Sequence, residues 1–202
     1  MTSTGQRPAP QQARAVRTRE RLLTAALQVL YERGYADTTT IAVCEQAGLS
    51  RGAQLHHFPN KAELVRASIE YLADQRAGEI RTEAAALPPG GDRVDIALGM
   101  LERTFTGRQF TLALEVWVAA RTDPELQAAL APLEQRIGRE LFRLTVEVLG
   151  VDGSRPDVRQ AVQLTLDLMR GLGLAGLLTD DRRRRQHLLH WHADQLRQLL
   201  NR

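Results

Sequence analysis

Apolar residues recur every three or four positions along nearly the whole chain, and this spacing constrains the fold more than any other feature. Such a spacing places apolar side chains on one face of a helix. The clearest early segment carries Leu22, Leu23, Ala26, Leu27 and Leu30. Later segments of the same kind cover residues 92–105, 108–121, 123–149, 156–178 and 182–200. With no convincing pair of strands, the sequence predicts an all-α fold of about nine helices.

Composition excludes several classes of protein. A single Cys rules out both a disulfide framework and a Cys-rich zinc site. No apolar run approaches the 18 residues of a membrane-spanning helix, and the first residues lack the apolar stretch of a signal peptide. We therefore expect a cytoplasmic protein without a membrane partner, beginning with a flexible tail over residues 1–13. The Pro-Gly segment 87–91 is the clearest break in the chain.

The charge of the chain is unevenly distributed. Residues 1–61 carry eight basic and four acidic side chains, whereas residues 62–202 carry 19 basic and 20 acidic ones. The basic excess in the first third is either ordinary surface scatter or the contact surface for a polyanion such as nucleic acid.

Residues 38–65 have the pattern of a helix-turn-helix. Thr39 or Thr40 is suited to cap one short helix, and Ser50 is suited to cap the next. Between them, Gly48 suits the left-handed backbone of a tight turn. Asn60 is suited to cap a long following helix that begins at Lys61. The spacing therefore predicts a DNA-binding module whose second helix enters the major groove.

The second short helix carries side chains that suit DNA. Arg pairs with guanine, Gln with adenine, and an Ala methyl packs on the methyl group of thymine. Lys61, at the start of the next helix, is placed to bind a phosphate. The candidate DNA-contacting residues are Thr39, Thr40, Ser50, Arg51, Ala53, Gln54, His56, His57 and Lys61. For Arg51 and Gln54 the alternative is a solvated surface, whereas Phe58, Leu64 and Cys44 are expected in the core.

These residues resemble the TetR/AcrR family of bacterial transcriptional regulators. The matching positions are Gly34-Tyr35, Thr39, Ala47-Gly48, Ser50, Gly52, His57-Phe58, Lys61 and Leu64. The resemblance implies a three-helix DNA-binding domain over residues 14–61 and a ligand-binding and dimerisation domain over residues 62–202. It implies that Thr39 approaches a phosphate, that Arg51, Ala53 and Gln54 face bases, and that His57 and Lys61 grip the backbone. Leu55 departs from the family, which usually has a phosphate-binding Tyr there, and His56 is the substitute.

The resemblance also implies a palindromic DNA operator, a homodimer and repression relieved by a small molecule; a constitutive regulator without a ligand is the alternative. Candidate pocket residues are Met100, Phe105, Phe110, Trp117, Phe142 and Arg170, with Arg121 or Asp167 as polar anchors, unless these residues are ordinary core and surface. Dimerisation would use the helices near 156–178 and 182–200. Their apolar stripes are Val162, Leu166, Met169, Leu172, Leu189, Leu196 and Leu199, which otherwise only close the core of one chain.

Three other patterns suggest different functions. Gly171, Gly173 and Gly176 spell the G-x-G-x-x-G fingerprint of a dinucleotide-dependent oxidoreductase, but too few residues follow for a second strand. His187, His190 and His192 do not share one helix face, so we expect no metal, and we expect no cofactor. The arginine run over residues 182–185 is a solvated helix face, a packing or dimer contact, or a second nucleic-acid site.

Overall fold

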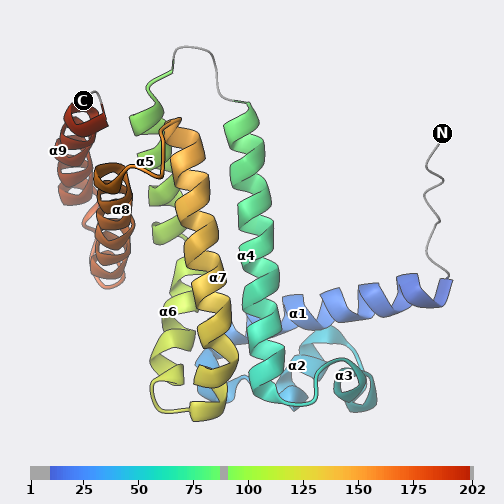
Figure 1. The fold of residues 1–202 in the computed structure, drawn as a ribbon. Coiled ribbons are helices and arrows are strands. Elements are labelled where there is room, and N and C mark those ends of the chain that lie inside the picture. Colours follow the sequence, from blue (N-terminus) through green and yellow to red (C-terminus); the bar gives the residue numbers. More distant parts are fainter. Residues whose placement is uncertain (1–9, 87–90, 201–202) are drawn as a thin grey trace, which may run out of the picture. The chain divides into compact units, whose positions relative to one another are not determined.

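The structure is a computed structural model that describes residues 10–86 and 91–200. Within these ranges the chain forms nine helices and no strand (Figure 1), which confirms the all-α prediction. The described residues fall into two compact units, each with its own buried residues. None of the helices in the described ranges has a stretch long and apolar enough to cross a membrane.

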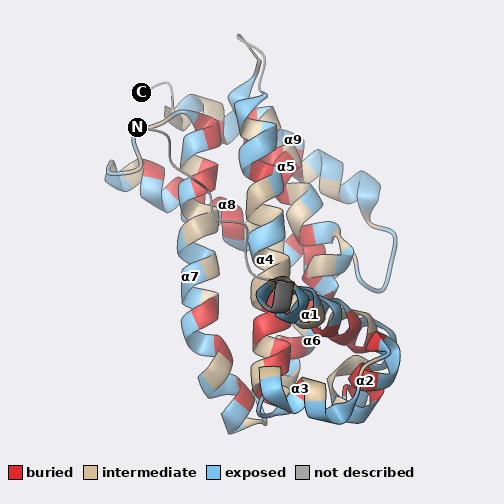
Figure 2. Ribbon diagram, turned by 90° about the vertical axis from the view of Figure 1, so that its right-hand side faces the viewer, coloured by how far each residue is buried: buried red, intermediate tan, exposed pale blue. Residues whose placement is uncertain are grey.

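The first unit comprises the described residues through Tyr71 together with Glu115–Leu130. It contains α1 (Pro10–Asp37), α2 (Thr40–Ala47), α3 (Arg51–His57) and the first part of α4 (Lys61–Ala85). Helix α1 packs on α2 and α3, which also contact one another. The shared core consists of Leu22, Leu23, Ala25, Ala26, Val29, Ala42, Val43, Ala47, Phe58, Leu64 and Ala67. Figure 2 shows the buried side of α1 lying over α2 and α3.

Two boundaries differ from the sequence-based prediction. Residues 10–13, expected in a flexible tail, form the first turn of α1, while residues 1–9 lie outside the described ranges. The first unit also includes residues 62–71 and 115–130, which the prediction assigned to the second domain. The periodic pattern near each helix does not reveal which distant segments pack on it, so the second difference was invisible in the sequence.

The second unit comprises residues 72–114 and 131–202, so far as they are described. It contains the rest of α4, α5 (Arg93–Thr106), most of α6 (Arg108–Ala120) and most of α7 (Pro124–Leu149). Helices α8 (Pro156–Ala175) and α9 (Arg182–Leu200) pack on one another and on α5. Helix α7 continues through Pro132, and the division of the chain into the two units falls within this helix, between Leu130 and Ala131.

Candidate functional site

The two short helices of the first unit are held by the caps that the sequence predicted. The Thr39 hydroxyl accepts a hydrogen bond from the backbone N–H of Ala42 at 3.1 Å, and the Ser50 hydroxyl accepts one from Ala53 at 3.3 Å. Between the helices, Gly48 has a φ of 61° and a ψ of 41°, the left-handed conformation that side chains other than hydrogen disfavour. These residues therefore fix α3 at a defined angle to α2, which is the geometry of a helix-turn-helix.

Helix α3 exposes a narrow face made of Arg51, Gly52, Leu55 and His56, which we call the α3 face. Half of the Leu55 surface is accessible, and Arg51 has no hydrogen bond or ion pair with any described residue. Ala53 lies at the edge of this face and is partly buried. A guanidinium and an imidazole flanking an apolar side chain can meet a guanine edge and a thymine methyl in the major groove. Leu55, whose predicted consequence was only a lost phosphate contact, is thus part of the exposed surface.

Gln54 does not belong to the α3 face, so its assignment to base contacts is wrong for this structure. Its side chain is fully buried, and its Nε2 donates to the carbonyl oxygen of Phe58 at 2.8 Å. Because Phe58 is a core residue four positions later, Gln54 lies on the same inward side of the helix. That spacing was the one signal in the sequence that could have placed Gln54 inside.

His57 is partly buried at the end of α3, next to Arg19 of α1. Burial lowers the pKa of His57, and the nearby His56 and Arg19 lower it further. The guanidinium of Arg19 lies 5.4 Å from the centre of the Phe58 ring. A neutral His57 at pH 7 would meet a phosphate as a hydrogen-bond donor and not as a cation. Thr39 is exposed and Thr40 partly so, which leaves both beside the start of α2.

The ammonium group of Lys61 makes its contacts within the protein. Its ammonium donates to the backbone carbonyls of Tyr35 and Ala36 at the end of α1, and it lies 3.9 Å from the centre of the Tyr35 ring. Burial lowers the pKa of Lys61, while Asp123 and Asp37 oppose that shift. The geometry therefore does not support the expected phosphate contact, because the amine already ties the start of α4 to the end of α1.

A set of polar contacts ties residues 115–130 to the helix-turn-helix within the first unit. The backbone N–H of Tyr35 donates to Glu115 at 3.0 Å, and the Tyr35 hydroxyl donates to Asp123 at 2.9 Å. Asn60 donates to Glu125 at 2.6 Å. The backbone bends here because Gly34 has a φ of 74°. We call these the Tyr35 contacts; the motif Gly34-Tyr35 pointed to the position but not to its partners.

A pocket of about 490 Å³ lies within the second unit, between the α5–α6 junction and the segment that joins α8 to α9. Phe105 and Phe110 line it, with their ring centres 5.3 Å apart in an edge-to-face arrangement. The other lining residues are Thr106, Thr111, Gly173, Gly176, Leu177, Leu178, Thr179, Asp180, Asp181, Arg182 and Arg185. The lining of the pocket therefore combines the aromatic side chains of α5 and α6 with charged side chains near the start of α9.

Only two of the eight candidate ligand residues, Phe105 and Phe110, line this pocket. Met100 is buried in the core, and Phe142 lies on α7 with Arg159 near its ring. Trp117 and Arg121 belong to the first unit. Asp167 and Arg170 pair with one another along α8 at 2.6 Å. Most of the other lining residues belong to the segment that joins α8 to α9. Apolar periodicity did not indicate that this segment lines a pocket.

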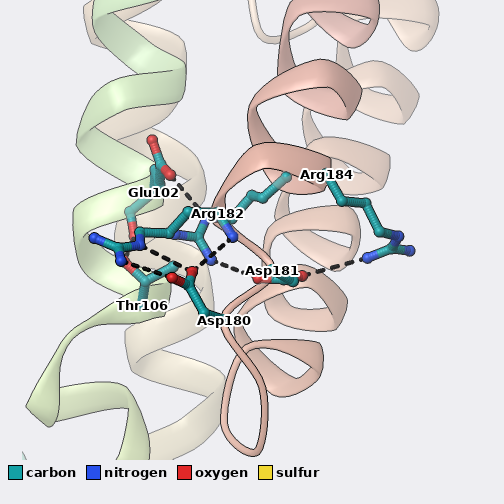
Figure 3. A network of polar contacts seen from close by, with 7 residues as sticks. Glu102, Thr106, Asp180, Asp181, Arg182 and Arg184 are labelled. Atoms are coloured by element: carbon teal, nitrogen blue, oxygen red, sulfur yellow. Dashed lines mark hydrogen bonds and ion pairs between the residues drawn. The ribbon is translucent and has the colours of Figure 1, made fainter.

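Three of the four arginines at the start of α9 pair with neighbouring carboxylates (Figure 3). Arg182 pairs with Asp180, and Arg184 pairs with Asp181. Arg185, with an 11% exposed side chain, contacts both Asp181 at 2.9 Å and Glu102 of α5 at 2.8 Å. The pairing with Arg182 is the main reason that the pKa of Asp180 falls to about 2. Arg185 therefore fastens α9 to α5, and the packing interpretation is the correct one for this residue.

One glycine near the end of α8, Gly173, permits close packing of helices. Gly171 and Gly173 lie inside α8, where the dinucleotide fingerprint requires a strand followed by a turn. A Cβ atom at Gly173 would overlap with the carbonyl oxygen of Phe105 and the ring of Phe110. The oxidoreductase alternative is thus contradicted, because Gly171 and Gly173 lie within a helix, and Gly173 lets α8 approach Phe105 of α5 and Phe110 of α6.

The predicted dimer stripe also belongs to the core of one chain. All of its members are buried except Leu199, which is partly buried. His192 lies among them, with its Nε2 2.8 Å from the Thr165 hydroxyl. A different set of apolar residues is exposed on and after α8 and on α9, namely Leu164, Leu174, Leu177, Leu178 and Trp191. The alternative interpretation, that the stripe closes the core, is therefore the one that the structure supports.

Comparison with known proteins identifies the family. The sequence model described as "Bacterial regulatory proteins, tetR family" matches residues 22–68. The HTH-type transcriptional regulator CymR of Pseudomonas putida is 35% identical over 175 residues, covering 86% of each chain. The regulator BetI 2 of Chromohalobacter salexigens is 26% identical over 185 residues, covering 88% of this chain and 87% of that one.

Solved structures share the fold along nearly the whole chain. A transcriptional regulator from Rhodococcus sp. Rha1 superposes with a TM-score of 0.68 at 22% identity, covering 91% of this chain and 96% of that one. The multidrug binding protein EbrR, solved in complex with imidazole, has a TM-score of 0.61 at 23% identity and covers 90% and 94% of the two chains. Together with the helix-turn-helix geometry, these matches show that the chain belongs to the TetR family of bacterial HTH-type transcriptional regulators.

Proposed function

We propose that the protein is a ligand-responsive repressor, which binds a palindromic operator as a dimer and releases it when a small molecule binds. The observation that carries this proposal is the path of α6. Phe110 and Thr111 of this helix line the pocket, and Glu115, one turn after Thr111, accepts the hydrogen bond from Tyr35. One continuous helix thus joins the pocket to the end of α1.

The Tyr35 contacts would turn a shift of α6 into a shift of α3. Burial and the neighbouring Asp123 raise the pKa of Tyr35, so its hydroxyl stays a donor at physiological pH. Lys61 holds the same end of α1 to the start of α4. Because packed elements move as bodies, a ligand that displaces α6 would alter the spacing of the two recognition helices in a dimer.

The lining of the pocket supports a small molecule with both apolar and polar parts. Phe105 and Phe110 offer an aromatic surface, and Thr106 and Thr111 offer hydroxyl groups. The solved relative EbrR is a multidrug binding protein. We propose that Arg170, whose guanidinium lies 5.7 Å from the centre of the Phe105 ring, supports the pocket from outside its wall.

The dimer would form through the exposed apolar residues of α8 and α9. Leu164, Leu174 and Trp191 are 64%, 56% and 62% exposed, which is costly for large apolar groups in a lone chain. Gly171 lies on the same side of α8 as Leu164 and has open space around it, so a second helix can approach closely. Two copies related by a two-fold axis would each cover the other's apolar surface. Such a regulator acts where bacterial DNA lies, in the cytoplasm.

Reciprocal binding tests the ligand response. An operator is first selected from random DNA, and compounds that raise the melting temperature of the protein are then added to the complex. Coupling requires that a compound weakens operator binding by the same factor by which the operator weakens compound binding, typically about 5–150-fold. Binding compounds that leave operator affinity unchanged would favour the constitutive alternative.

Sedimentation velocity tests the dimer. The wild-type chain should sediment as a dimer at micromolar concentration, and Leu164→Glu should sediment as a folded monomer. Arg183→Glu, on an exposed side chain of α9 outside the apolar set, is the control and should stay dimeric. A monomeric wild-type chain contradicts the proposal.

A further inference from the structure

The first turns of α1 project beyond the core of the first unit. The inward line of this helix, which includes Leu22 and Ala26, continues at Ala15, yet Ala15 is exposed. Gln12, Arg14, Val16 and Arg17 are exposed as well. Figure 1 shows this end of α1 extending past α2 and α3. Because these side chains do not pack on the core, packing does not explain why this segment is helical and charged.

Arg21 fixes the direction in which the arginines of this segment point. Its guanidinium donates to the backbone carbonyl of Ala47 at 2.6 Å and approaches that of Gly48 at 3.5 Å, so Arg21 faces the turn of the helix-turn-helix. Residues four and seven positions apart lie on the same side of a helix. Arg17 and Arg14 therefore share the side of Arg21, and we call these two residues the α1 arginines.

The α1 arginines carry uncompensated charge. Neither has a hydrogen bond or ion pair with any described residue, and Glu20 is the one acid between residues 12 and 31. By the rise of a helix, they lie about 6 and 10 Å farther along α1 than Arg21. The turn that Arg21 contacts leads directly into Arg51 at the start of α3, and the major groove that α3 would enter is about 12 Å wide.

We propose that Arg14 and Arg17 bind phosphates of duplex DNA outside the groove that α3 occupies, and so extend the operator beyond the helix-turn-helix contact. This inference rests on the proposed operator binding. The contacts are electrostatic and carry no sequence information themselves, because phosphates are the same at every base pair. They add affinity to every half-site and lengthen the DNA that each subunit covers.

The experiment measures the salt dependence of binding to two probes, the operator selected from random DNA and a random-sequence duplex of the same length. Arg14→Ala/Arg17→Ala should weaken binding to both, and because a dimer loses four phosphate contacts, the slope of log affinity against log salt should fall by about four. Arg14→Lys/Arg17→Lys should restore most of the slope, since a phosphate accepts either cation. Arg33→Ala, an exposed arginine near the other end of α1, is the matched control and should leave the slope unchanged.

Shortening the operator adds a second readout. Trimming the flanking base pairs should lower the operator affinity of the wild-type protein until it equals that of the double variant. The affinity of the double variant should itself not change on trimming. An unchanged salt slope in Arg14→Ala/Arg17→Ala, with wild-type DNA binding intact, overturns this inference alone. A wild-type chain that binds neither duplex overturns the proposed operator binding as well.

Discussion

Two arginine-rich regions of the molecule contrast in how their charge is used. The run at the start of α9 is the densest basic segment of the sequence, yet Asp180, Asp181 and Glu102 neutralise three of its four arginines. In the first unit the arginines are sparse, and Arg14, Arg17 and Arg51 have no carboxylate partner among the described residues. The density of basic residues in a sequence therefore misleads, because carboxylates brought close by the fold decide which charges remain for a polyanion.

The largest effect that tests this contrast is the loss of stability in Arg185→Ala. The substitution leaves Asp181, with a 10% exposed side chain, and Glu102 without their main cation. We expect the free energy of unfolding to fall by about 3 kcal/mol, measured by urea denaturation. Arg183→Ala, at an exposed position without a partner among described residues, should change it by less than about 0.5 kcal/mol. Equal losses of unfolding free energy in the two variants would show that the ion pairs of Arg185 do not stabilise the protein.

Arg51→Ala should show the opposite behaviour. Its side chain is exposed and has no hydrogen bond or ion pair with a described residue, so the free energy of unfolding should stay within about 0.5 kcal/mol of wild type. Affinity for the selected operator should fall by about 1–3 kcal/mol, with relaxed preference at one base pair, as measured by fluorescence anisotropy on single-base variants. A loss that is uniform across sequences would instead assign Arg51 to a phosphate.

Lys61→Met separates a structural cation from a DNA-binding one. Removing the ammonium leaves the carbonyls of Tyr35 and Ala36 without their donor, so we expect the free energy of unfolding to fall by about 1–2 kcal/mol. The salt slope of DNA binding should stay as in wild type. A slope lower by about two, one for each subunit of the dimer, with unchanged stability, would restore the phosphate role predicted from the sequence.

The smallest expected effect is on the pH dependence of stability and concerns His192, a buried residue of α9. Its partner is the hydroxyl of Thr165, whereas the partners of Arg185 are carboxylates. Burial lowers the pKa of His192 below its ordinary value of 6.5. Its contribution to stability is therefore complete above pH 6.5 and is lost as the pH falls toward the lower folded-state pKa, by at most about 1.4 kcal/mol per pH unit. Urea denaturation between pH 7.5 and 5.5 should give a shallower pH dependence for His192→Asn than for wild type. Identical dependences would show that His192 does not titrate in this range.

Local features of the fold followed from the sequence, whereas features that depend on distant partners did not. The caps at Thr39 and Ser50, the left-handed Gly48 and the start of α4 after Asn60 rest on near neighbours, and all are confirmed. Phe58, Leu64 and Cys44 are buried as expected. In contrast, the contacts Lys61–Tyr35, Tyr35–Asp123 and Arg185–Glu102 join residues that are 26, 88 and 83 positions apart in the chain. No periodic pattern encodes such pairs.

Gln54 illustrates a second limit of sequence reasoning. Residue type suggested a contact with adenine, but the geometry of a seven-residue helix allows only some of its side chains to face outward. Its amide instead binds the carbonyl of Phe58 and closes the end of α3. Chemical suitability for a base therefore does not outweigh the side of the helix on which a residue lies.

The small size of the α3 face bears on how much DNA sequence one subunit can recognise. If the α3 face reads the operator as proposed, its few outward side chains, Arg51, Leu55 and His56, would specify few base pairs in each half-site. Many chance matches to a single half-site must then exist, and competition from them dilutes a lone subunit. The spacing and symmetry of paired half-sites, more than the identity of individual bases, should distinguish the true control region from the rest of the chromosome.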